Sequence, residues 1–535
     1  MKSTPTLQKI SPRSLNLSDI QYTFLQTAND LTEQYWKNFS DTCENRAYHF
    51  IHPEQLENIY YTLISHKIIH LVARPVVLEL NIARQLEELQ GDTPYNRFHY
   101  FLNHLDKNEF RQLYPALSRL LHTTLHNFNA YLLEIFDNYT SDWKTLFPSE
   151  AQPPCITNIS ADLLDVYPDG RCVAILSFDN ALKWVYKPRD CAVDVAFQSL
   201  LSWFNTKNQA HPFKLLNIIS RETYSWNEFA KQSETFSKEQ IKIAYQKIGS
   251  VLCLFYLFDA IDMHRENCIL SDDNICLIDL ETLLQPRVQK KMYRTLRHTH
   301  FLPSIQKEVL PDQDDLHYAQ ENVKEWDNKV WTSEKSFCWK NEGQDTMQIL
   351  RRRILVGKSD SRLIVDGQPL NPLDYLQYMS KGFRKTYRFI EANKTEFLEK
   401  VNTLFNGLKI RVIVRATKKY DALIDEMTHP AILESEAKLE DFLAALNVET
   451  DNSDDENLII DAEKKHLSHM TNPSFFTLTN QKGLYTEGGQ LIPDYFETDA
   501  LTVVQLNIAE MNNQDLGKQI RILQRSFKCL KPILT

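Results

Sequence analysis

The feature that most constrains the fold is an apolar run, IGSVLCLFYLFDAI at 248–261, followed by a short polar loop and a second apolar stretch, ICLI at 275–278. The first run is too short to span a membrane as a helix, since a span needs about 20 apolar residues. We therefore predict a buried helix that leads into the loop and a buried strand that follows it. The loop carries Asp262, His264 and Asn267, and Asp279 ends the strand.

The spacing of these polar residues favours phosphoryl transfer. Asp262 and Asn267 have the Asp-to-Asn spacing of the protein-kinase catalytic loop, and Asp279 follows where kinases place a second metal-holding aspartate. One carboxylate would accept a hydroxyl proton, while an amide oxygen and a second carboxylate would hold Mg²⁺. The alternative is that these acidic residues are only the solvated ends of buried elements.

A lysine upstream completes the expected order. Lys187 ends the β-rich run WVYK, where a kinase has the strand lysine that contacts nucleotide phosphates. This order along the chain, a lysine followed by the Asp and Asn of the loop and then by a second Asp, favours a kinase-type enzyme that uses ATP and Mg²⁺. With only 12 glycines, the sequence contains no G-x-G-x-x-G loop and no Walker A loop. A hairpin without the usual glycines would therefore have to cover the ATP.

Charge and cysteine content narrow the class of protein. The net charge of −10 over 535 residues argues against a nucleic-acid binder. The nine cysteines are scattered without a C-x-x-C pair, which is typical of reduced thiols. The N-terminus has no apolar signal region, and no stretch is long enough for a transmembrane span. The sequence thus predicts a cytoplasmic protein without a membrane span.

Four regions follow from the change of periodicity along the chain. Residues 1–150 are expected to form a helical annex, with a break or kink near Pro75, serving as a scaffold or as a docking surface for a peptide. Residues 151–300 would form the kinase-like core. Residues 301–446 would add helices and a strand that completes a phosphate site. Residues 447–535 would comprise an acidic mobile loop at 447–457 and a C-terminal helical segment.

A strand meander is expected at the start of the core. The turn signal Pro168-Asp169-Gly170 separates two β-rich runs, and the run ending in Lys187 follows. The tip from Asp165 to Arg171 would lie over the phosphates as a glycine loop does. The basic stretches at 287–297 and 351–353 are either solvated faces or grips for a phosphate or an acidic peptide.

A second strand is predicted at 409–417. Alternation would place Arg411, Arg415 and Thr417 on one face, where two guanidiniums and a hydroxyl could bind an anion. The alternative is an amphipathic strand with a solvated basic face.

These motifs together resemble the N-terminal dehydratase domain of class II lanthipeptide synthetases. The resemblance rests on YKPR (186–189), D-x-H-x-x-N (262–267), DLETLL (279–284) and R-x-x-x-R-x-T-x-x-Y (411–420). It implies an α+β fold with a two-lobed, lipid-kinase-like or protein-kinase-like core and large helical additions. It also implies phosphorylation of Ser and Thr in a precursor peptide, followed by phosphate elimination to dehydroalanine or dehydrobutyrine.

The resemblance implies residue roles as well. Lys187 would contact the nucleotide phosphates, and Asp262 would be the phosphorylation base, with His264 in the same set. Asn267 and Asp279 would hold Mg²⁺. Asp165, Arg411 and Thr417 match the residues used for elimination.

Three departures from the family pattern qualify this interpretation. Tyr167 stands where the family has the His of a D-x-H pair, and a phenol with a pKa near 10 is a poor proton carrier. The string MTNPSFF (470–476) differs from the family's usual D-I-P-Y-F type string. No Cys/His zinc set for a cyclase is present, so ring closure is not expected of this chain. The alternatives are a stand-alone dehydratase-like protein, a dehydratase with a separate cyclase partner, and an excised domain. A kinase acting on another protein, a lipid or a small molecule, and a leader-peptide-binding pseudoenzyme, remain alternatives.

Overall fold

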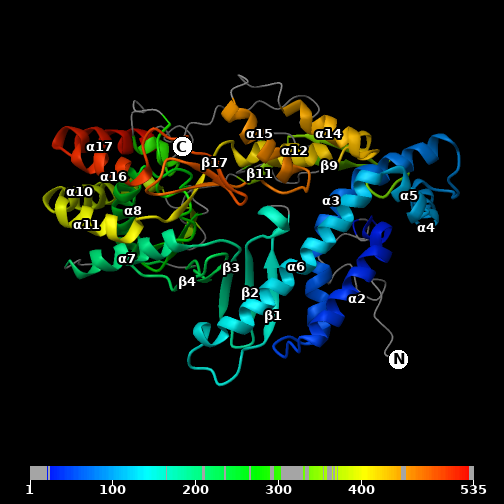
Figure 1. The fold of residues 1–535 in the computed structure, drawn as a ribbon, viewed down its shortest axis with the longest axis horizontal. Coiled ribbons are helices and arrows are strands. Elements are labelled where there is room, and N and C mark those ends of the chain that lie inside the picture. Colours follow the sequence, from blue (N-terminus) through cyan, green and yellow to red (C-terminus); the bar gives the residue numbers. More distant parts are fainter. Residues whose placement is uncertain are drawn as a thin grey trace.

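Two hydrophobic cores organise the chain, and their elements occupy opposite sides of the molecule (Figure 1). The computed structural model describes residues 21, 24–163, 166–207, 211–233, 236–263, 267–288, 295–302, 329–331, 336–353, 355–357, 364–365, 368–369, 371–446 and 454–528. Within these residues the protein is α+β, combining many helices with small antiparallel sheets.

Helices dominate the first 150 residues, as expected. They are η2 (Gln26–Ala28), α2 (Asn29–Asn45), α3 (Pro53–Gln85), α4 (Pro94–His104), α5 (Lys107–Leu113) and α6 (Pro115–Leu146). The Thr93 side chain caps α4 by accepting from Asn96 N, and Pro94 takes the first helical position. The break expected near Pro75 is wrong, since α3 runs through this proline as one helix.

A five-stranded antiparallel sheet follows and packs beside α3 and α6 (Figure 1). Its order is β1-β2-β3-β5-β4, and β1–β3 form the predicted meander. The turn signal at 168–170 forms the short 3-10 helix η3 (Pro168–Gly170), at the tip of a long β1–β2 connection. The strands are β1 (Ile156–Ala161), β2 (Ala174–Phe178), β3 (Lys183–Lys187), β4 (Ile218–Ser220) and β5 (Ser225–Glu228).

The second core is mainly helical and is built around α8 (Lys238–Phe258). A capping box between Ser237 and Gln240 begins this helix, and Asp259 ends it in the left-handed conformation. By length and composition α8 is apolar enough to cross a membrane, yet most of it is buried inside the protein. The surrounding elements are α7 (Ala192–Thr206), β6 (Cys268–Ser271), β7 (Asn274–Leu277), η5 (Leu296–Thr299), η6 (Pro372–Tyr375), α10 (Leu376–Ala392), α11 (Lys394–Phe405), α16 (Ala500–Ala509) and α17 (Asn513–Lys528).

A four-stranded sheet with flanking helices lies between these parts. Its strands are β14 (Lys409–Val412), β15 (Phe475–Leu478), β16 (Leu484–Thr486) and β17 (Gly489–Ile492), and its helices are α12 (Thr417–Met427), α13 (Pro430–Leu433), α14 (Glu436–Ala444) and α15 (Asp454–Leu467). Strand pairs β8 (Lys329–Trp331) with β11 (Leu355–Gly357), β9 (Ser336–Lys340) with β10 (Gln348–Arg352), and β12 (Ile364–Val365) with β13 (Gln368–Pro369) complete the described elements.

Two sequence expectations in this region need correction. The strand predicted to reach Thr417 ends at Val412, and Thr417 begins α12. The acidic stretch at 447–457 is not loop throughout, because Asp454, Asp455 and Glu456 form the first turn of α15. Acidic side chains suit the N-terminal turn because they interact favourably with the helix dipole. Residues 447–453 lie outside the described residues.

Candidate functional site

The predicted kinase residues meet where the five-stranded sheet approaches the β6–β7 hairpin. Lys187 is nearly buried at the end of β3, and its ammonium lies 4.0 Å from Asp279 Oδ1. The same ammonium donates a hydrogen bond to Ile278 O, the carbonyl just before Asp279. The strand lysine and the carboxylate after β7 therefore share one site, although 91 residues separate Lys187 from Ile278 in the chain.

Backbone and side-chain bonds hold the loop residues beside this pair. Ile278 N donates to Asn267 O at 3.1 Å, which aligns Asn267 with the end of β7. Asn267 Nδ2 donates to Asp262 O at 3.0 Å. Asp262 has a φ of 59°, a left-handed conformation that Asp adopts more readily than most residues. These bonds thus connect Asn267 both to Asp262 and to Ile278, the residue before Asp279. His264 lies outside the described residues.

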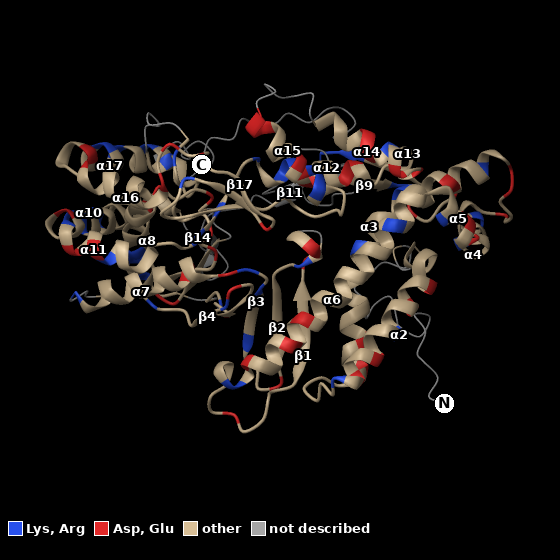
Figure 2. Cartoon of the chain, viewed as in Figure 1, with Lys and Arg blue, Asp and Glu red and all other residues tan. Residues whose placement is uncertain are grey.

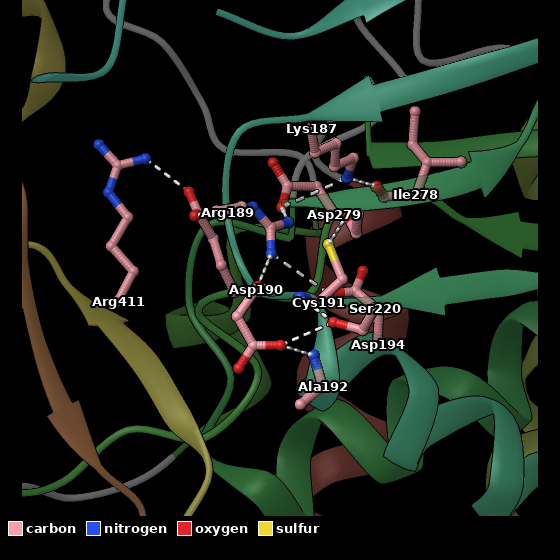
Figure 3. Close-up of polar contacts among 12 residues, drawn as sticks. Lys187, Arg189, Asp190, Cys191, Ala192, Asp194, Ser220, Ile278, Asp279 and Arg411 are labelled. Atoms are coloured by element: carbon pink, nitrogen blue, oxygen red, sulfur yellow. Dashed lines mark hydrogen bonds and ion pairs between the residues drawn. The ribbon is translucent and has the colours of Figure 1, made fainter. Parts of the chain in front are cut away.

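Arg189 occupies the centre of a charged cluster that the sequence did not reveal (Figure 3). Its guanidinium contacts Asp279 at 2.6 Å, Glu281 at 3.2 Å and Asp194 at 3.4 Å. Arg411 from β14 contacts Glu281 at 2.6 Å from the other side. Three cations and three carboxylates therefore alternate here, an arrangement in which each buried charge has a compensating partner.

Each of these residues lies close in the sequence to another member of the cluster. Arg189 follows Lys187 in a bend after β3, and Glu281 follows Asp279 in a turn after β7. Arg189 and Glu281 stand in the motifs YKPR and DLETLL, and this was the signal that could have identified them. Asp194 is fully buried in the first turn of α7. It is the one acidic residue in the apolar string CAVDVAF, and this pattern could have identified it as a buried carboxylate.

The neighbouring positive charges keep the carboxylate of Asp279, the predicted Mg²⁺ ligand, ionised. Burial alone would raise the pKa of Asp279, but Lys187, Arg189 and Arg411 lower it below the usual value. Asp194 behaves in the opposite way, since burial raises its pKa despite Arg189 and Lys187. The cluster thus contains one carboxylate stabilised as an anion and one that resists ionisation.

The predicted shared strand face of Arg411, Arg415 and Thr417 is wrong, because β14 ends before the last two residues. Arg411 joins the cluster, and its carbonyl accepts a hydrogen bond from Gln285. Arg415 instead pairs with buried Glu463 of α15 at 2.8 Å. Because the strand ends at Val412, the alternation that would have aligned Arg411, Arg415 and Thr417 does not extend that far.

Tyr167 of the hairpin tip lies in the field of the same charges. Burial and the Glu281 carboxylate raise its pKa well above the ordinary value, with Arg189 and Arg411 acting in the opposite direction. Its backbone N–H donates to Arg171 O and so closes the tip. Asp165 lies outside the described residues.

Both basic stretches contribute an arginine to an ion pair within the protein, and the described cysteines form no disulfides. Arg287 pairs with Asp259 at 3.0 Å, and Arg351 pairs with Glu426 and lies over Phe337; residues 289–294 lie outside the described residues. Lys and Arg are intermixed with Asp and Glu across the described elements in Figure 2. The eight cysteines within the described residues are all free thiols.

Fold and site together define an α+β protein with a buried cluster of alternating charges where its two cores meet. A family model described as "Domain of unknown function (DUF4135)" matches residues 114–478. Because the match covers more than half of the chain, the protein belongs to this family. The matched region includes every candidate residue named above.

One curated relative agrees with the resemblance expected from the motifs. It is the "Lacticin 481/lactococcin biosynthesis protein LcnDR2" of Lactococcus lactis subsp. lactis, 22% identical over 490 residues, which are 86% of this chain and 52% of the relative. The chain therefore spans about half the length of that relative. Family and relative together confirm the likeness to class II lanthipeptide synthetases.

Proposed function

We propose that the protein phosphorylates Ser and Thr residues of a ribosomal precursor peptide, using ATP and Mg²⁺, and then eliminates the phosphate. One observation carries the proposal: the Lys187 ammonium lies 4.0 Å from Asp279 Oδ1, beside the loop of Asp262 and Asn267. This is the set of groups that kinase-type phosphoryl transfer needs in one place. The relative's role in lacticin 481 biosynthesis supports a precursor peptide as the substrate.

The residues present fit a magnesium ion. The side-chain Nδ2 of Asn267 donates a hydrogen bond to Asp262 O. This leaves the side-chain amide oxygen as a potential ligand of Mg²⁺. Asp279 remains anionic, as a Mg²⁺ ligand must. The ion, when bound, would neutralise phosphate charge, while Lys187 and Arg411 supply fixed positive charge around it. Asp262 would accept the proton of the substrate hydroxyl.

The elimination step depends on the group at position 167 of the hairpin tip. Tyr167 replaces the family's His, and its raised pKa keeps the phenol protonated at neutral pH. This favours the alternative of a kinase that transfers phosphate without removing it, including one with another protein, a lipid or a small molecule as its substrate. A separate cyclase partner and a cytoplasmic location stay predictions from the sequence.

The test is incubation with ATP, Mg²⁺ and a candidate precursor peptide, followed by mass spectrometry. We expect a phosphorylated peptide and then a peptide that has lost water. Asp262→Asn should lower the phosphorylation rate by about 10²–10⁴-fold, the usual contribution of a general base. Asp279→Asn should abolish the Mg²⁺-dependent reaction, whereas Asp272→Asn, in the β6–β7 turn, should be as active as the wild type.

Each other outcome has a defined meaning. Phosphorylation without water loss would establish a kinase-only enzyme. ATP binding by thermal shift without product would favour the leader-peptide-binding pseudoenzyme. Unchanged phosphorylation by both Asp262→Asn and Asp279→Asn would show that the site is elsewhere.

A further inference from the structure

A buried lysine outside the charged cluster lacks a hydrogen-bond partner among the described residues. Lys67 of α3 is 5% exposed, and its ammonium has no hydrogen bond to any residue that the structure describes. Burial lowers the pKa of this amine to about 8, with Cys172 and Asp162 acting in the opposite direction. A buried cation without a hydrogen bond is costly, so the site favours a bound anion or a deprotonated amine.

Lys67 is one of the residues that line a small cavity formed by four separate segments. Ile64 and Lys67 come from α3, Thr124 and Asn127 from α6, Leu163 and Val166 from the β1–β2 connection, and Met470 and Thr471 from the segment after α15. The space of about 20 Å³ holds one water-sized group. One oxygen of a larger anion would therefore fit inside.

The chemistry of the lining selects for negative charge. Among the described residues that line the cavity there is no Asp or Glu, while Lys67 supplies a cation. Thr124 and Asn127 add a hydroxyl and an amide that can donate hydrogen bonds. The cavity thus combines one desolvated ammonium with neutral donors, and such donors bind oxyanions strongly because their hydrogen bonds are charge-assisted.

The walls of the cavity are fixed by independent contacts. Tyr131 of α6 donates to Cys172 O at 2.6 Å, and Asn472 N donates to Val166 O at 3.2 Å. Gly170 at the hairpin tip has a φ of 73°, and a Cβ there would approach Asn127 Cβ to 3.3 Å. These contacts hold the hairpin against α6, so the cavity is preformed.

We propose that the cavity around Lys67 binds a small oxyanion of the phosphate class, with Lys67 as its cation and Thr124 and Asn127 as neutral donors. The ligand is either free inorganic phosphate or the phosphoryl group of a phosphorylated peptide. This site is separate from the Lys187 cluster and does not depend on the function proposed above.

The test measures binding of inorganic phosphate and of a phosphoserine tripeptide by calorimetry, at constant ionic strength set with chloride. Lys67→Met should weaken binding at this site about tenfold to hundredfold, the loss expected for one hydrogen bond to a charged group. Lys187→Met should retain this binding event. Lys67→Gln provides a second variant that keeps a polar side chain.

The matched control is Lys247, which is equally buried but donates to Asn274 Oδ1 at 2.6 Å. Lys247→Met should retain phosphate binding and lower the melting temperature, whereas Lys67→Met should not lower it. Binding of only one of the two ligands would identify the source of the anion and support the site. Equal phosphate binding by the wild type, Lys67→Met and Lys67→Gln would overturn the proposal, as would no phosphate binding by Lys187→Met.

Discussion

Arg189 Nη2 donates to Asp279 Oδ1 at 2.6 Å. Arg189, which follows β3, therefore neutralises the carboxylate that is expected to hold magnesium. The contact joins the Lys187 segment to the β7 segment across the two cores. Arg189 therefore has two roles in the described structure. It compensates the buried Asp194, and it orients Asp279 beside Lys187.

Replacing Arg189 alone should destabilise the protein more than replacing Arg189 and Asp194 together. We expect Arg189→Met to lower the free energy of unfolding by about 3–5 kcal/mol, because a buried carboxylate loses its cation. In the double variant with Asp194→Asn, part of this loss should be recovered. Urea unfolding of both single variants and the double variant gives the coupling energy. Strict additivity would show that the two side chains do not act as a pair.

Acid should affect the two buried carboxylates in opposite directions. The pKa of Asp279 is lowered in the folded protein, so its stabilisation is present above the unfolded pKa of about 4 and is lost as the pH falls. The pKa of Asp194 is raised, so its contribution is largest in acid and is lost as the pH rises through the folded value.

Unfolding free energies measured from pH 3 to pH 7 test this difference. Asp279→Asn should flatten the loss of stability on acidification relative to the wild type, and Asp194→Asn should steepen it. Parallel changes in the two variants would contradict the assigned directions.

Substitution at the hairpin tip should separate phosphorylation from elimination. Tyr167→Phe removes the phenol oxygen and should leave both activities as they are, because the phenol stays protonated at neutral pH and so does not act as a base. Tyr167→His introduces a group that titrates near neutrality, and we expect it to increase water loss from the phosphorylated peptide. The measurement is the ratio of dehydrated to phosphorylated peptide. A large fall in this ratio for Tyr167→Phe would assign the phenol a chemical role.

The crossing of α8 and α10 should not tolerate a methyl group. A Cβ on Gly249 would lie 1.9 Å from Met379 O, and one on Gly382 would lie 1.8 Å from Gln246 O. Gly249→Ala should therefore lower stability by about 1–3 kcal/mol or more, as overpacking does. Gly488→Ala is the matched control, since its nearest atom would be at 3.6 Å, and it should change stability by less than about 0.5 kcal/mol. Thermal unfolding compares the two.

The sequence by itself determined the local elements and the order of the reactive groups. The apolar run of α8, the meander ending in Lys187 and the strand before Asp279 are found as expected, because hydrophobic periodicity and turn residues act over short distances. The same patterns misplaced the end of β14. Continued alternation to Thr417 was compatible with a strand, but Thr417 begins α12 and Arg415 finds its carboxylate on α15.

Only the tertiary structure decided which charges neutralise one another. Arg189 and Asp194 come from one segment, Glu281 from a second and Arg411 from a third, and no spacing in the sequence indicates that the three segments share a site. The ammonium of Lys67, which lacks a hydrogen-bond partner among the described residues, was equally hidden, because a lysine in an apolar helix is expected to extend its amine to solvent. The burial of a side chain depends on which other elements pack against its own element. Ion-pair partners that are distant in the sequence are brought together only by the complete fold.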